Sequence, residues 1–169
     1  GLRLDQFHHP TWDPMPYFQE ALRRDPGDSR TNIAVGIIKM RQARVEEAEK
    51  FFKTALSRVT ESWYRPREGE AYYYHGLALR SLGRLDEAVA DLNQAAWSEG
   101  FHSAAHIQLA GIAILEKNYA KALEHLDRSL STNATNTSAM SLKAAALRKL
   151  ERFEEAAAIA AQAGAADVL

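Results

Sequence analysis

The stretch EAYYYHGLALRSLGRLDEAVADLNQAA, residues 70–96, decides the fold of this 169-residue chain. Apolar residues fall at helical spacing before and after Gly83, and glycine adopts the left-handed conformation of a helix end without penalty. The pattern predicts two short amphipathic helices joined by a tight turn. Because such a hairpin cannot bury both of its apolar stripes alone, it requires neighbours of the same kind.

Related segments recur along the chain, and each has an alanine at the same place in its second helix. The segments read RVEEAEKFF, RLDEAVADL, NYAKALEHL and RFEEAAAIA, and their alanines are Ala48, Ala88, Ala122 and Ala156, at intervals of 40, 34 and 34 residues. A period of about 34 with a small residue at each helix crossing resembles the tetratricopeptide repeat. The resemblance implies an all-α fold, a right-handed superhelical solenoid of antiparallel helix pairs.

The period also divides the chain. Residues 1–28 are expected to form a lead-in and a half-repeat helix, and residues 29–62, 69–102, 103–136 and 137–169 to form four repeats. The interval of 40 places six extra residues, 63–68, before the second repeat. The last repeat is expected to be incomplete and uncapped, because its final helix is mostly alanine. We therefore expect possible self-association through this helix.

Composition excludes several classes of function. Twenty-one Lys and Arg residues against 22 Asp and Glu leave a formal net charge of −1, so no global field attracts nucleic acid or an anionic membrane. There is no cysteine for disulfides or thiolate zinc sites. No apolar run approaches the roughly 20 residues of a membrane span, and the first residues lack the pattern of a signal peptide. We expect a cytoplasmic location.

The family resemblance implies a binding surface, because the first helices of tetratricopeptide units line a concave face on which ligands usually lie. The implied groove has an apolar middle with arginines to one side, and a glycine within it would permit close backbone approach. Some of these side chains could instead pack only against neighbouring helices. The groove residues are Ile33, Ile37, Met40, Arg41, Tyr73, Leu77, Arg80, Ile107, Gly111, Ile114 and Arg148.

The extra residues near position 63 offer a second surface. Trp63, Tyr64 and Arg65 belong to residue types enriched at binding hot spots, which favours an exposed contact loop. The alternative is that the aromatic side chains fold back onto the solenoid.

No catalytic or metal site is predicted. His102 and His106 are four residues apart, a spacing that zinc can use, and Glu99 is nearby, but His106 occupies a position that normally packs between helices, which favours ordinary packing. The sequence has no phosphate-binding loop and no nucleophile motif. We therefore expect a protein without enzymatic activity and without a cofactor.

Three segments together carry a closer resemblance: DPMPYFQEALRRDPGDSR, GEAYYYHGLALRSLGRLDEA and LEHLDRSLSTNATN. They are similar to the C-terminal repeats of large bacterial proteins whose β-rich N-terminal domain is uncharacterised and looks carbohydrate-related. The sequence thus predicts an interaction or assembly module that binds a protein or peptide segment in its groove. The alternative is a non-catalytic C-terminal arm that supports or oligomerises a carbohydrate-acting domain.

Overall fold

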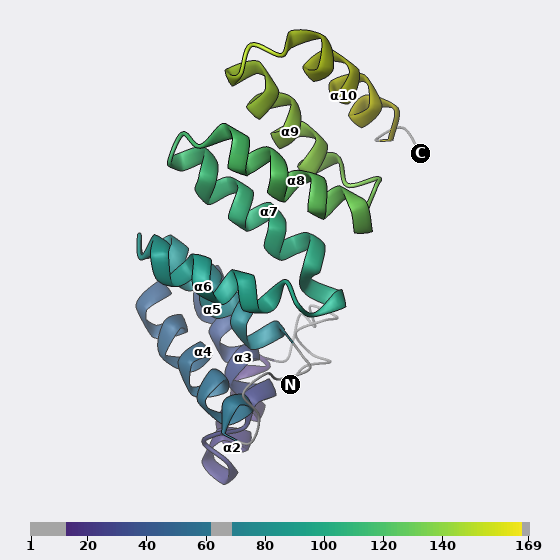
Figure 1. Cartoon of the computed structure of the whole chain (residues 1–169). Coiled ribbons are helices and arrows are strands. Elements are labelled where there is room, and N and C mark those ends of the chain that lie inside the picture. Colours follow the sequence, from purple (N-terminus) through teal and green to yellow (C-terminus); the bar gives the residue numbers. More distant parts are fainter. Residues whose placement is uncertain (1–12, 62–68, 167–169) are drawn as a thin grey trace.

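The computed structural model describes residues 13–61 and 69–166, and within these ranges the chain forms nine helices and no strand. The helices follow one another along an elongated, bent molecule with α2 near one end and α10 at the other (Figure 1). No helix in the described ranges is long and apolar enough to cross a membrane. The helices are α2 (Met15–Arg24), α3 (Ser29–Arg41), α4 (Val45–Thr60), α5 (Glu70–Ser81), α6 (Leu85–Ala95), α7 (Glu99–Leu115), α8 (Tyr119–Thr132), α9 (Thr137–Lys149) and α10 (Phe153–Ala166).

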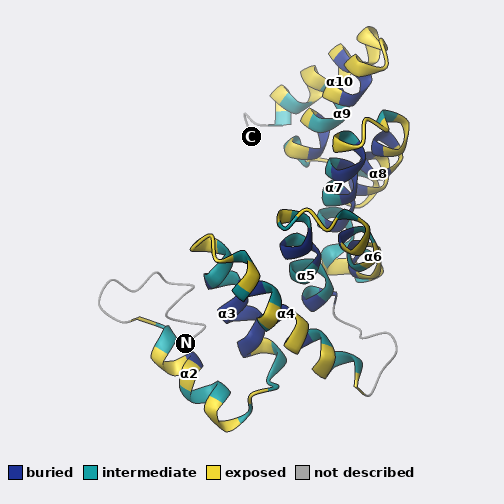
Figure 2. Cartoon of the chain, turned by 90° about the vertical axis from the view of Figure 1, so that its left-hand side faces the viewer, coloured by how far each residue is buried: buried dark blue, intermediate teal, exposed yellow. Residues whose placement is uncertain are grey.

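The helices pack as pairs that stack in chain order. The pairs are α3–α4, α5–α6, α7–α8 and α9–α10, and α2 packs on α3. The second helix of each pair contacts the first helix of the next, while α3, α5, α7 and α9 also contact one another in series. In Figure 2, α5 and α7 lie on the inner side of the bend and α6 and α8 on the outer side. The predicted solenoid is therefore confirmed.

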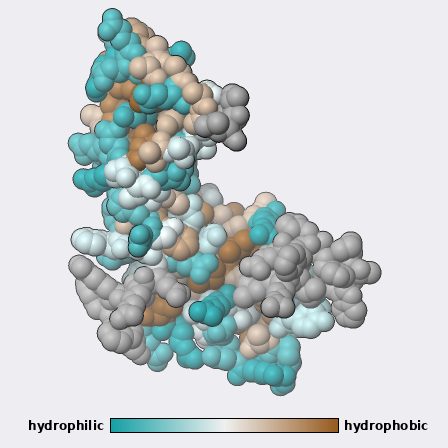
Figure 3. Space-filling view, turned by 90° about the vertical axis from the view of Figure 1, so that its right-hand side faces the viewer, coloured by the Kyte–Doolittle hydropathy of each residue, from teal (hydrophilic) through white to brown (hydrophobic). Residues whose placement is uncertain are grey.

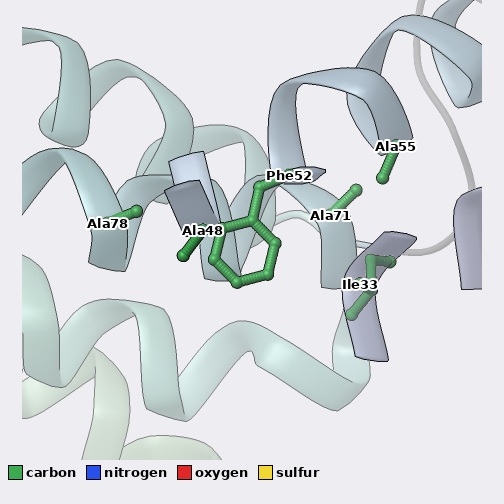
Figure 4. Close-up of a cluster of buried hydrophobic side chains, with 6 residues drawn as sticks. All are labelled: Ile33, Ala48, Phe52, Ala55, Ala71 and Ala78. Atoms are coloured by element: carbon green, nitrogen blue, oxygen red, sulfur yellow. The ribbon is translucent and has the colours of Figure 1, made fainter. Parts of the chain in front are cut away.

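One packing arrangement repeats inside the first pairs. Ala48 and Ala88 are fully buried, and four residues later Phe52 and Leu92 are also fully buried. The position of α3 that faces Phe52 has no room for a side chain, because a Cβ on Gly36 would lie 2.4 Å from the Phe52 ring. Figure 4 shows this ring among buried alanines of α4 and α5 and beside Ile33 of α3. A large residue thus fills the space that small residues leave at each crossing.

The turns inside the pairs also repeat. Gly83 has φ 76°, as predicted, but the equivalent positions hold Ala43 at 58°, Lys117 at 59° and Glu151 at 60°. After each of these residues the next backbone N–H donates to the carbonyl five residues earlier, as in Arg84 to Leu79. This hydrogen bond closes the helix end in the Schellman pattern. The turn geometry is therefore kept even where a side chain strains the backbone.

One helix boundary differs from the sequence expectation. The third repeat is expected to begin at residue 103, but its first helix, α7, begins at Glu99. Ser98 has extended backbone, and Glu99 places a carboxylate in the first turn, where the helix dipole favours it. A side chain at Gly100 would meet no atom within 4 Å, so this glycine lies in the first turn without a packing role.

Two histidines pack against each other between α7 and α8. His106 is 4% exposed and His125 is 8% exposed, and their Nδ1 atoms lie 3.1 Å apart. A hydrogen bond between two ring nitrogens needs one donor and one acceptor, so at least one ring is neutral. Burial, with the neighbouring positive groups, lowers the pKa of His106 to about 4, and burial also lowers the pKa of His125.

The crossing arrangement predicts a contrast between two neighbouring alanines of α6. Ala88 is fully buried and Ala90 is exposed. Ala88→Leu should lower the free energy of unfolding by about 1–3 kcal/mol or more through overpacking, whereas Ala90→Leu should change it little. Urea unfolding of the two variants measures the difference. Equal midpoints would show that the repeat positions are assigned incorrectly.

The buried histidine pair predicts a loss of stability in acid. The unfolded chain takes up protons on histidine near pH 6.5, while folded His106 does so only near pH 4. Between these values the unfolded state binds more protons, so the free energy of unfolding should fall as the pH falls. His106→Gln should reduce this dependence of the free energy of unfolding on pH. At pH 7, where His106 is neutral, the difference in stability between the variant and the unchanged chain measures the loss of packing alone. An unchanged slope in the variant would contradict the assignment.

Candidate functional site

The first helices of the pairs form the inner side of the bend and carry the predicted groove residues. Figure 3 shows this hollow in profile, with apolar surface along the bend and further apolar surface on the arm that holds the C-terminal helices. On this concave face, side chains of α5 and α7 contact each other directly.

Three aromatic side chains meet where α5 and α7 start. The ring centroids of Tyr73 and Tyr74 lie 5.4 Å apart, and those of Tyr73 and Phe101 lie 5.2 Å apart. Tyr74 also stacks on Phe52 at 5.8 Å, which joins the cluster to the core of the preceding pair. Burial raises the pKa of both tyrosines, so their hydroxyl groups stay protonated at neutral pH.

A polar network lies beside this cluster. Arg80 of α5 donates to the side-chain carbonyl of Gln108 on α7, and both side chains influence the pKa of the nearby Tyr73 hydroxyl. The Arg80 guanidinium covers Gly111, where an added Cβ would lie 3.2 Å from its Nη2 atom. The close approach expected at Gly111 is therefore made by the chain's own Arg80.

The α3 part of the predicted groove is largely used for packing. Ile33 is only 6% exposed and belongs to the core cluster around Phe52. Ile37 and Met40 are half-buried against the same cluster, whereas Arg41 is exposed. Ile33 thus has almost no surface to offer a partner, because the ring of Phe52 and its neighbours cover it.

The remaining predicted groove residues lie partly on α5 and α7 and partly on α9. Leu77 is half-buried on α5, and Ile107 and Ile114 are half-buried against the cluster that α7 shares with α8 and α9. Arg148 lies apart from them, with Lys149, at an open groove of about 840 Å³ between α9 and α10. The structure therefore brings Tyr73 and Arg80 together and assigns Arg148 to a separate concavity.

Histidines and carboxylates make structural contacts. His75 lies between Asp91, which its Nδ1 atom contacts, and Glu49, whose Oε1 atom is 3.5 Å from its Nε2 atom. His102 contacts the Ala96 carbonyl through Nδ1 at 2.8 Å, while His106 packs on His125. Across residues 13–61 and 69–166, no three His, Cys, Asp or Glu side chains converge as metal ligands would.

Phe101 and Gln108 are site residues that the sequence prediction missed. Phe101 lies in the first turn of α7, before residue 103 where the third repeat was expected to begin, so it had no assigned face. Gln108 lies within the expected third repeat, but its role depends on Arg80 of another helix. The proposed contact loop, Trp63, Tyr64 and Arg65, lies outside the described residues.

Comparisons with known proteins agree with this architecture. Two family models described as tetratricopeptide repeat match residues 28–96 and residues 73–138. A crystal structure of MamA is similar with a TM-score of 0.77 at 19% identity, over 89% of this chain and 84% of that one. PilF of Pseudomonas aeruginosa gives a TM-score of 0.75 at 20% identity, over 86% of this chain and 65% of that one.

A third solved structure is YrrB, described as a TPR protein with an unusual peptide-binding site. Its TM-score is 0.69 at 18% identity, over 89% of this chain and 75% of that one. At these identities the likeness shows the fold alone. The expected likeness to the C-terminal repeats of large proteins with a β-rich domain stays a prediction. The two family models together span residues 28–138, so this part of the chain consists of tetratricopeptide repeats.

Proposed function

We propose that this chain is a protein-interaction module that binds a segment of a partner protein on the concave face of α5 and α7. The observation that carries the proposal is the aromatic cluster of Tyr73, Tyr74 and Phe101 beside the Arg80–Gln108 pair. Tetratricopeptide folds generally act as scaffolds for protein contacts, and YrrB is described as having a peptide-binding site.

The chemistry of this face suggests the kind of segment. Tyr73 and Phe101 offer rigid aromatic surface at low entropic cost, as binding hot spots do. Ile107 and Ile114 extend the apolar surface along α7. Arg80 has five donors, and its contact with Gln108 leaves others for a carboxylate of the partner. The expected ligand is an extended or helical segment with apolar anchors and one or two acidic residues.

Two variants test the division of roles on this face. A partner is first captured from the source lysate with the 169-residue chain, identified, and then titrated as a purified protein. Tyr73→Ala should weaken its affinity about tenfold or more, because an aromatic anchor is lost. Arg80→Ala should weaken it less but remove most of its dependence on salt.

Phe153→Ala is the matched control, because Phe153 is an exposed aromatic residue of α10 outside this face. Its affinity for the partner should equal that of the unchanged chain. Deletion of residues 63–67 tests the insertion as the competing surface. Full affinity in Tyr73→Ala together with lost affinity in the deletion would refute binding on the α5–α7 face.

A further inference from the structure

One repeat position gives two histidines opposite surroundings. Asp91 of α6 and His125 of α8 are one period of 34 residues apart, so they occupy the same position in their pairs. Asp91 contacts the Nδ1 atom of His75, whereas His125 contacts the Nδ1 atom of His106. The same place in the stack thus pairs one histidine with a carboxylate and another with a second histidine.

His75 of α5 lies between carboxylates from two other helices. Asp91 of α6 contacts its Nδ1 atom, and the Oε1 atom of Glu49 on α4 lies 3.5 Å from its Nε2 atom. This Nε2 atom is buried and has no hydrogen-bond partner among the described residues. Arg84 contacts the same Glu49 oxygen at 3.4 Å, and the charge of Glu87 on α6 also acts on the ring. A proton added at Nε2 therefore finds an acceptor in Glu49 and joins α4, α5 and α6.

The pair of His106 and His125 has the opposite surroundings. Their Nδ1 atoms lie 3.1 Å apart, so protons on both nitrogens would remove the hydrogen bond and bring two cations together. The titratable groups that act on the pair by charge are mostly basic. They are His102 of α7 and Lys121, Arg128 and the acidic Glu124 of α8. Protonation of both rings therefore opposes the contact of α7 with α8.

A pocket gives protons a route to this pair. It has a volume of about 120 Å³, lies between α6, α7 and α8, and is lined by His125 together with Asn93, Glu116 and Lys121. These polar side chains can hold water, which needs two or more hydrogen-bond partners. The pair can therefore exchange protons with solvent while the chain is folded. Since burial lowers the pKa of His106 to about 4, acid favours a state in which this ring is open to water.

We propose that the two histidine sites make the stack a pH-dependent hinge, in which acid loosens α7 from α8 while His75 keeps α4, α5 and α6 together. The helices α8, α9 and α10 pack on one another in series, and α7 packs on α6 and α5. A weakened contact between α7 and α8 therefore divides the chain into two arms. The hinge is a property of the fold and does not depend on the function proposed for the α5–α7 face.

Hydrogen exchange of the 169-residue chain tests the hinge, measured by mass spectrometry at about pH 7.5 and about pH 5 and corrected for the intrinsic exchange rate. Because His106 takes up its proton near pH 4 when folded and near pH 6.5 when open to water, the protection of α8 amides should fall about thirtyfold at pH 5. The protection of α5 amides should stay the same or rise. An equal loss in α5 and α8, which indicates global unfolding, would overturn the proposal, and so would unchanged protection in α8.

The double variant His106→Met, His125→Ile is the matched control, because the last pair has Met140 and Ile159 at the equivalent positions. Neither new side chain takes up a proton, so α8 should keep its protection at pH 5. His75→Gln should leave the acid response of α8 unchanged and lower the protection of α5 more at pH 5 than at pH 7.5.

An acid response of α8 that persists in the folded double variant would refute the hinge. So would α5 protection that His75→Gln leaves unchanged at both pH values. Should circular dichroism show the double variant to be unfolded, the comparison of α5 with α8 in the unchanged chain decides.

Discussion

The structure depends on a packing contact inside the first three helix pairs, in which a small residue of the first helix lies against a large side chain of the second. Gly36 has no room for a Cβ because the Phe52 ring occupies that space, and Gly76 is in the same position against Leu92, where a Cβ would lie 2.9 Å from Cγ. Close approach of the two helices lets a single Phe or Leu fill the crossing without a cavity. The contact therefore fixes how far apart the helices lie and how each pair presents its surface to the next.

Because each pair packs mainly on its neighbours, the fold extends in one direction and its parts depend on local interfaces. The α7–α8 interface differs from the others by including His106 and His125 in place of apolar side chains. These rings pack as neutral groups. Their pKa values are low because burial away from water disfavours the charged form of each ring. Acid sensitivity is thus located in one interface of the stack.

The sequence predicts what repeats and misses what depends on contacts between repeats. The period of about 34, the crossing alanines and the turn at Gly83 are visible in one dimension, and they are sufficient for the fold class. The covering of Gly111 by Arg80 is not visible, since it needs the distance between α5 and α7. The same limit applies to Ile33, whose burial depends on Phe52 in another helix. The groove on α5 and α7 and the repeat boundaries stay predictions.

The same repeat position takes different roles according to its place in the stack. Met40, Arg80, Ile114 and Arg148 are equivalent, and the first and third are half-buried against apolar clusters. Arg80 reaches an acceptor on the following helix, so its charge contributes to the packing of α5 on α7. Arg148 belongs to the last described pair, and no described helix covers its side. Whether an arginine at this repeat position is paired therefore depends on the helix that follows it in the stack.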